Sequence, residues 1–179
     1  RAIVPAITAT REAGKKRIWE NFIEPVEDGS GVLKSISFKN TERFNFAFDV
    51  IDEIANRYPE KLAMIHIDSK DNERRFTYKD IKRASNQTAH YFASLGIKRG
   101  DRVMLVLKRH YQFWFAMVAL HKLGAIAIPA TNQLKEHDFE YRFNAADVKA
   151  IVCTATDNTP EQVDLAAKNS PSLQTKIIV

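Results

Sequence analysis

Cysteine is almost absent from this sequence: Cys153 is the only one among 179 residues, so no disulfide can form within the chain. Because disulfides are rare in reducing compartments, such a chain is typical of the cytosol, and we expect a cytoplasmic protein. Long apolar runs are missing as well. The longest covers residues 113–120, whereas a membrane-spanning helix needs roughly 20 apolar residues. We therefore expect no membrane span.

The sequence also lacks the short motifs that mark common catalytic and cofactor sites. It has no Walker-type phosphate loop, and Gly29-Ser30-Gly31 lacks the third glycine of a dinucleotide-binding fingerprint. Its five histidines show no spacing typical of a metal site. No pattern of residues in the sequence indicates a catalytic triad of a serine or cysteine nucleophile with histidine. We therefore predict no catalytic, cofactor-binding or metal-binding residue in this chain.

The net charge of +5, from 27 basic and 22 acidic residues, raises nucleic acid as a partner. However, the basic residues are spread along the chain, and acidic or apolar residues interrupt their short runs. No zinc-finger spacing or RNA-binding signature accompanies them. We therefore expect no nucleic-acid partner.

What the sequence does contain is the composition of a folded domain. Hydrophobic residues make up 45% and charged residues 27%, an ordinary globular balance. The first residue is Arg1 rather than methionine, so we expect a processed product or a piece of a larger protein. We divide the chain into an N-terminal extension, residues 1–40, and a main domain, residues 41–179. The extension is expected to be irregular, apart from an amphipathic helix over 10–23 and a strand over 32–38.

From residue 44 onward the spacing of apolar residues alternates between helical and strand periodicity. The first predicted elements are a helix over 46–58, strands over 62–67 and 74–76, and a helix over 77–95. The two strands, with a polar turn between them, predict a small hairpin. Thr77 and Asp80 have the spacing of a capping box at the start of the second helix, and Gly96 suits its left-handed C-cap.

A repeating strand–helix pattern follows. The predicted strands cover 102–107, 125–129, 150–153 and 176–179, and the predicted helices cover 111–123, 134–146 and a segment that starts at Thr159. After Arg102, residues 103–107 form a continuous apolar run, which is typical of a strand buried on both faces. We expect Thr159 to be the cap of the last helix, with Pro160 at its first position. The alternation predicts an α/β fold, a layered parallel sheet with flanking helices.

Ligands of open parallel sheets bind at the carboxyl ends of the strands, so three turns are the places to search. The first, residues 108–110, is basic. It could bind phosphate, but we expect a basic turn exposed to solvent. The second, residues 129–132, is small and polar, and suits either close approach by a ligand or a plain connection. The third contains Thr154, Thr156 and Asp157, for which the sequence offers no pairing partner.

Several segments resemble the adenylate-forming acyl-CoA synthetases. They are residues 44–52 (FNFAFDVID), residues 76–81 (FTYKDI) and residues 95–103 (LGIKRGDRV). Residues 113–115 (FWF) and 122–131 (KLGAIAIPAT) resemble the medium-chain, butyrate-like branch of that superfamily in particular. The resemblance extends from about residue 44 to residue 179, and it does not cover the first forty residues.

This resemblance implies an enzyme that joins a carboxylic acid to coenzyme A through an acyl-adenylate, using ATP and Mg²⁺ and releasing AMP and pyrophosphate. It implies that Ala130, Thr131 and Asn132 line the route to the coenzyme A and acyl site. The phosphate loop of such enzymes lies downstream of residue 179, so we expect a truncated subdomain that is inactive alone and binds no cofactor tightly. Two alternatives stay open: a naturally short binding module, and another adenylate-forming enzyme such as an aryl-CoA ligase.

Overall fold

The computed structural model describes residues 16–179. The chain divides into two compact units, an N-terminal unit of residues 1–44 and a C-terminal unit of residues 45–179. The helix predicted over 10–23 lies partly outside the described residues. In its described part, a 3₁₀-helix (η1) covers only Ile18–Asn21, and Ile23 already begins a strand, so the predicted end of that helix is wrong.

The N-terminal unit contains an antiparallel hairpin of strands β1 (Ile23–Glu27) and β2 (Leu33–Phe38). The Asp28 carboxylate closes its turn, because Oδ1 accepts hydrogen bonds from the backbone N–H groups of Ser30 and Val32, each at 3.0 Å. Strand β2 confirms the strand that was predicted over residues 32–38. Its partner β1 was not predicted, since the sequence there reads as an irregular segment around Pro25.

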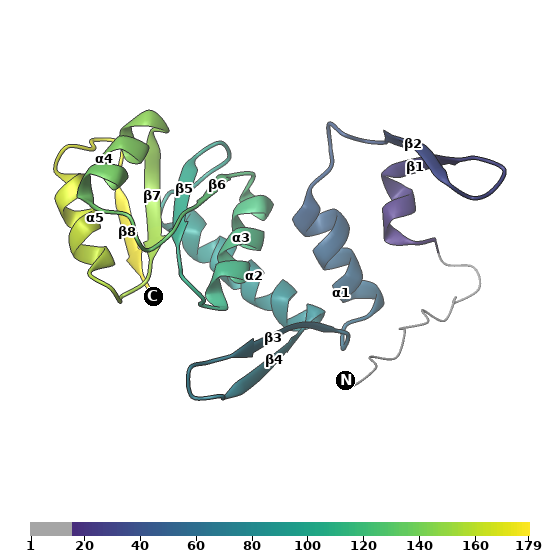
Figure 1. Cartoon of the computed structure of the whole chain (residues 1–179), viewed down its shortest axis with the longest axis horizontal. Coiled ribbons are helices and arrows are strands. Elements are labelled where there is room, and N and C mark those ends of the chain that lie inside the picture. Colours follow the sequence, from purple (N-terminus) through teal and green to yellow (C-terminus); the bar gives the residue numbers. More distant parts are fainter. Residues whose placement is uncertain (1–15) are drawn as a thin grey trace. The chain divides into compact units, whose positions relative to one another are not determined.

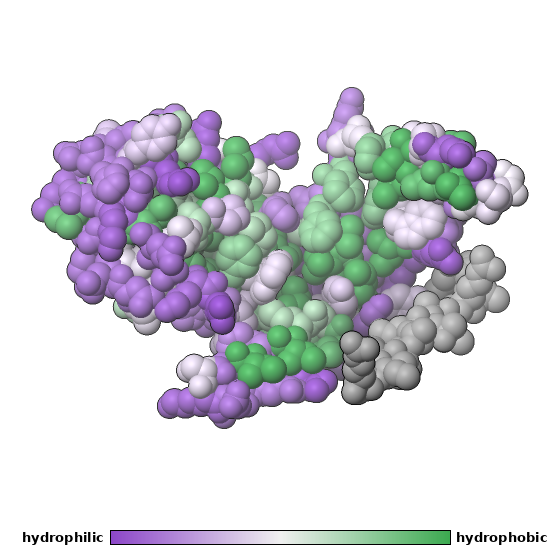
Figure 2. All heavy atoms as spheres, viewed as in Figure 1, coloured by the Kyte–Doolittle hydropathy of each residue, from purple (hydrophilic) through white to green (hydrophobic). Residues whose placement is uncertain are grey.

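The C-terminal unit follows the predicted order of elements. Its elements are η2 (Ala47–Asp52, a π-helix), α1 (Glu53–Arg57), β3 (Leu62–Ile67), β4 (Glu73–Thr77), α2 (Tyr78–Ser94), β5 (Arg102–Val106), α3 (Gln112–Leu123), β6 (Ile126–Pro129), α4 (Glu136–Ala145), β7 (Val148–Cys153), α5 (Thr159–Ala167) and β8 (Thr175–Ile178). Strands β3 and β4 form the predicted hairpin. Figure 2 shows apolar side chains along this hairpin and a mostly polar surface over α4 and α5.

Four parallel strands form the sheet, in the order β6-β5-β7-β8, which confirms the predicted layered α/β fold. Helices α2 and α3 cover one face and α4 and α5 cover the other (Figure 1). Strand β5 explains this two-sided burial: Val103 and Leu105 pack with α2 and α3, whereas Met104 and Val106 pack with α4 and α5. After Arg102, every position of this strand holds a buried apolar residue, and these residues supply both layers of the core.

Helix ends match the expectations at α2 and differ at α5. The Thr77 hydroxyl accepts a hydrogen bond from the Asp80 N–H at 3.2 Å, and the Asp80 carboxylate accepts one from the Thr77 N–H at 3.0 Å, so the capping box is confirmed. The N-cap of α5 is Asn158 rather than Thr159, and the buried Thr159 hydroxyl has no hydrogen-bond partner among the described residues. Gln162 instead accepts a hydrogen bond from the Glu136 N–H at 2.8 Å, at the start of α4.

Within residues 16–179, each helix is too short or too polar to cross a membrane.

Candidate functional site

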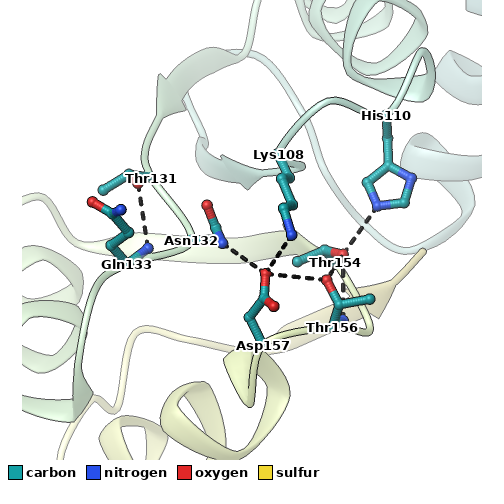
Figure 3. Close-up of polar contacts among 8 residues, drawn as sticks. All are labelled: Lys108, His110, Thr131, Asn132, Gln133, Thr154, Thr156 and Asp157. Atoms are coloured by element: carbon teal, nitrogen blue, oxygen red, sulfur yellow. Dashed lines mark hydrogen bonds and ion pairs between the residues drawn. The ribbon is translucent and has the colours of Figure 1, made fainter. Parts of the chain in front are cut away.

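The carboxyl ends of β5 and β7 are the place where this sheet can hold a ligand. The two strands are neighbours, yet the chain leaves β5 toward α3 on one face and leaves β7 toward α5 on the other. In open parallel sheets, ligands bind where the chain leaves neighbouring strands toward opposite faces in this way. The three turns singled out in the sequence all lie at this edge, and Figure 3 shows their side chains gathered there.

The Asp157 carboxylate joins the three turns. Its Oδ2 accepts a hydrogen bond from Lys108 Nζ at 2.7 Å, after β5, and a second from Asn132 Nδ2 at 2.8 Å, after β6. Thr156, beside it in the loop after β7, donates a longer hydrogen bond of 3.4 Å to the same oxygen. The expectation that the third turn has no pairing partner is therefore wrong, and Lys108 is held in an ion pair rather than being simply solvated.

A second set of polar groups extends this cluster toward the β5–α3 turn. His110 Nε2 lies 3.0 Å from Thr154 Oγ1, and that hydroxyl lies 3.1 Å from Thr156 Oγ1. Thr154 is fully buried, so these hydrogen bonds satisfy a hydroxyl that water does not reach. From His110 to Lys108, the edge of the sheet thus carries one connected polar network (Figure 3).

The charges in the cluster balance one another. The hydrogen bond from Lys108 is the main cause that lowers the pKa of Asp157 below its usual value, so the carboxylate is ionised at neutral pH. An ammonium already paired with a carboxylate is a weaker anion ligand than a free one, because an incoming phosphate must displace that carboxylate. The arrangement therefore favours neutral, hydrogen-bonding contacts over a phosphate clamp at Lys108.

The predicted site residues Ala130, Thr131 and Asn132 behave differently from one another. The Ala130 N–H donates to the Leu105 carbonyl at 2.9 Å and its side chain packs against the core. Thr131 is exposed, and its hydroxyl accepts a hydrogen bond from the Gln133 N–H at 3.3 Å. Asn132 is half-buried and is the only one of the three whose side chain joins the cluster in Figure 3.

A magnesium site does not fit this cluster. Magnesium prefers several oxygen ligands, chiefly carboxylates and water. The cluster has one carboxylate, Asp157, which Lys108 and Asn132 already engage. In the described part of the chain, no group of three or more His, Cys, Asp or Glu residues could hold a metal ion.

Comparison with known proteins places this fold in a family. Residues 51–179 match the AMP-binding enzyme family. Acyl-coenzyme A synthetase ACSM5, mitochondrial, of Rattus norvegicus is 34% identical over 144 residues, which cover 77% of this chain and 25% of that protein. Acyl-coenzyme A synthetase ACSM2A, mitochondrial, of Homo sapiens is also 34% identical over 144 residues, covering 76% of this chain and 24% of that protein.

Solved structures agree on the fold. The fatty acyl CoA synthetase of Mycobacterium tuberculosis aligns with a TM-score of 0.67 at 23% identity, over 75% of this chain and 26% of that one. The N-terminal domain of FACL13 from the same organism aligns with a TM-score of 0.69 at 23% identity, over 76% of this chain and 34% of that one. The chain spans about a quarter of the length of the curated relatives that it matches. Since the family match covers residues 51–179, well over half of the sequence, the chain belongs to the AMP-binding enzyme family.

Proposed function

We propose that the protein containing this chain is an ATP-dependent acyl-CoA synthetase for short- or medium-chain carboxylic acids. The acid would react with ATP to give an acyl-adenylate and pyrophosphate, and coenzyme A would then displace AMP to give the thioester. The observation that carries the proposal is the 34% identity over 144 residues to proteins named acyl-coenzyme A synthetases. The polar cluster at the carboxyl edge of the sheet supports it, because ligands of such sheets bind at this edge.

Within that reaction, this chain would supply one wall of the coenzyme A route. Ala130, Thr131 and Asn132 are the residues we assign to it, and their place at the carboxyl edge supports the assignment. The route would offer the small polar surface of Thr131 and the amide of Asn132. Mg²⁺ would neutralise phosphate charge in the complete protein, but the described residues do not fit a site for it. No adenylation step is therefore assigned to a residue of this chain.

Acid-dependent exchange of labelled pyrophosphate into ATP tests the proposal. The complete protein should catalyse exchange with short- or medium-chain aliphatic acids, and the 179-residue chain alone should catalyse none. Preference for benzoate over every aliphatic acid would favour the aryl-CoA ligase alternative. Absence of exchange with both kinds of acid would refute the proposal and favour a binding module.

We further propose a cytoplasmic location and no nucleic-acid partner. The single cysteine, Cys153, supports a reducing compartment. The relatives' names carry the word mitochondrial, so cell fractionation should follow the protein against markers of both compartments. Recovery in the mitochondrial fraction would refute the location.

A further inference from the structure

We propose that Asp157 is a positioning residue that holds the β6–α4 loop, residues 130–135, in the conformation that receives coenzyme A. This inference rests on the proposed function, because it assigns a ligand to that loop. The resemblance that suggested the coenzyme A route concerns residues 130–132 alone. Asp157 lies 25 residues beyond Asn132 and 49 residues beyond Lys108 in the sequence. Its role is inferred from its hydrogen bonds to these two side chains in the structure.

Three hydrogen bonds attach the loop to the rest of the domain, and Leu134 near its end also packs against the core. At its start, the Ala130 N–H donates to the Leu105 carbonyl at 2.9 Å. Just after its end, the Glu136 N–H donates to Gln162 Oε1 at 2.8 Å. Between these two points, Asn132 Nδ2 donates to Asp157 Oδ2 at 2.8 Å. Loss of the middle attachment would therefore loosen the loop while both of its ends stay fixed.

The middle attachment links parts of the sheet that the strand ladder does not join. Strand β5 lies between β6 and β7, so the loops after β6 and β7 are separated by a strand. Asp157 bridges this gap with one oxygen, and Lys108, which follows β5, donates to the same oxygen. The ammonium fixes the direction of the carboxylate, and the carboxylate fixes the amide of Asn132. Hydrogen bonds to a charged group are stronger and more directional than neutral ones.

The backbone at Asp157 decides which substitutions are informative. Its φ is +62°, in the left-handed region that favours glycine and tolerates asparagine. Asp157→Gly therefore removes the carboxylate without new strain, whereas alanine would add strain of its own. Asp157→Asn keeps an oxygen acceptor of the same size but removes the charge. Asp164→Ala is the matched control, since it removes another partly exposed aspartate–lysine pair, formed with Lys176, from helix α5, which begins two residues after Asp157.

Hydrogen exchange measured by mass spectrometry on the complete, ligand-free protein tests the positioning without any activity. We expect amides 131–135 to exchange about tenfold faster in Asp157→Gly than in the unaltered protein, with Asp157→Asn between the two and Asp164→Ala unchanged. Asn132→Leu, which removes the other partner, should reproduce the effect of Asp157→Gly. Equal exchange of 131–135 in Asp157→Gly and Asp164→Ala would overturn the inference. So would an increase spread evenly over β7 and α5, because that indicates general destabilisation.

Steady-state kinetics of the complete protein then test the ligand. Asp157→Gly should raise the KM for coenzyme A about tenfold and change acid-dependent ATP–pyrophosphate exchange less than twofold, and Asp157→Asn should have an intermediate KM. An unchanged KM for coenzyme A, beside a loosened loop, would overturn the assignment of the ligand. If the unaltered protein forms no acyl-CoA at all, the proposed function fails, whereas the hydrogen-exchange result still decides whether Asp157 holds the loop.

Discussion

Removal of the buried Lys122 ammonium should destabilise the C-terminal unit more than any surface charge change. Lys122 lies on α3, and its Nζ donates to Asp52 Oδ1 at 2.8 Å, at the end of η2, and to Asn86 Oδ1 at 2.6 Å, on α2. The Lys122 side chain is 5% exposed and that of Asp52 is 12% exposed. Nζ also lies 5.8 Å from the centre of the Phe48 ring. One ammonium thus connects three helical segments.

The size of the expected loss in the free energy of unfolding follows from the burial of this ion pair. At 2.8 Å and an effective dielectric constant of about 20, the two charges attract by about 6 kcal/mol, and this attraction offsets the several kcal/mol that each ion loses on leaving water. Lys122→Met removes the attraction but leaves the Asp52 carboxylate buried. Breaking a buried pair in this way costs about 3–5 kcal/mol of the free energy of unfolding.

Urea unfolding followed by far-UV circular dichroism measures this cost. With a denaturant slope of about 2 kcal/mol per molar, the urea midpoint should fall by about 1.5 to 2.5 M. Lys79→Met is the matched control, because Lys79 forms an exposed pair with Glu60 at 3.5 Å, and it should shift the midpoint by less than about 0.3 M. The double variant Asp52→Leu/Lys122→Met should recover most of the loss, since no charge is then left buried. Equal midpoints for Lys122→Met and Lys79→Met would refute the reasoning.

Three smaller effects should be measurable in the same protein. Thr77→Ala should cost about 1 kcal/mol at pH 7, and the cost should shrink as the pH falls below about 4. The N–H and the hydroxyl of Thr77 both donate to the Asp80 carboxylate and lower its pKa, so the carboxylate stabilises the fold above its usual pKa and loses that effect in acid. The variant keeps the N–H and lacks the hydroxyl, so urea unfolding at about pH 7 and about pH 3 would detect the hydroxyl's share. Gly124→Ala should cost about 1–2 kcal/mol in thermal unfolding, because Gly124 has φ +66° and an added Cβ would lie 3.2 Å from Arg99 Cγ; an unchanged Tm would contradict this. Burial raises the pKa of the Cys153 thiol to about 11, so an aromatic disulfide reagent at pH 8 should label it only as fast as the protein unfolds, and rapid labelling of the native protein would contradict the buried position.

The fold of residues 45–179 could be predicted because apolar periodicity encodes it directly. Each apolar residue of β5 faces one of two helical layers, so a continuous apolar run there permits little except a strand buried on both faces. Strand β1 could not be predicted in this way. Pro25 suggests a break, yet it is accommodated because β1 pairs with a single partner, β2, and needs only one edge of its backbone for pairing.

The polar cluster could be predicted only in part, because its contacts depend on strand order. The sequence indicates that residues 108–110, 129–132 and 154–157 follow strands, and therefore that they share one edge of a parallel sheet. It does not indicate that β5 lies between β6 and β7, which is what brings Asp157 within reach of both Lys108 and Asn132. Similarly, Thr159 has the residue type of a cap, but a left-handed Asn158 at φ +57° takes that position.

The residue types that adopt positive φ differ between the two ends of the sheet. This difference supports a functional role for the carboxyl edge. At the amino end, Gly96, Gly100 and Gly124 adopt positive φ, with Asp147 as an exception. At the carboxyl end, the positive-φ positions hold Lys108, Asp157 and Asn158. A lysine in this conformation costs about 1 kcal/mol or more relative to glycine. Since Lys108 and Asp157 form the ion pair of the cluster, the protein keeps side chains at positions where glycine would relieve the backbone. Such a cost is expected where the side chains themselves are required, as in a binding site, and not where a turn only has to reverse the chain.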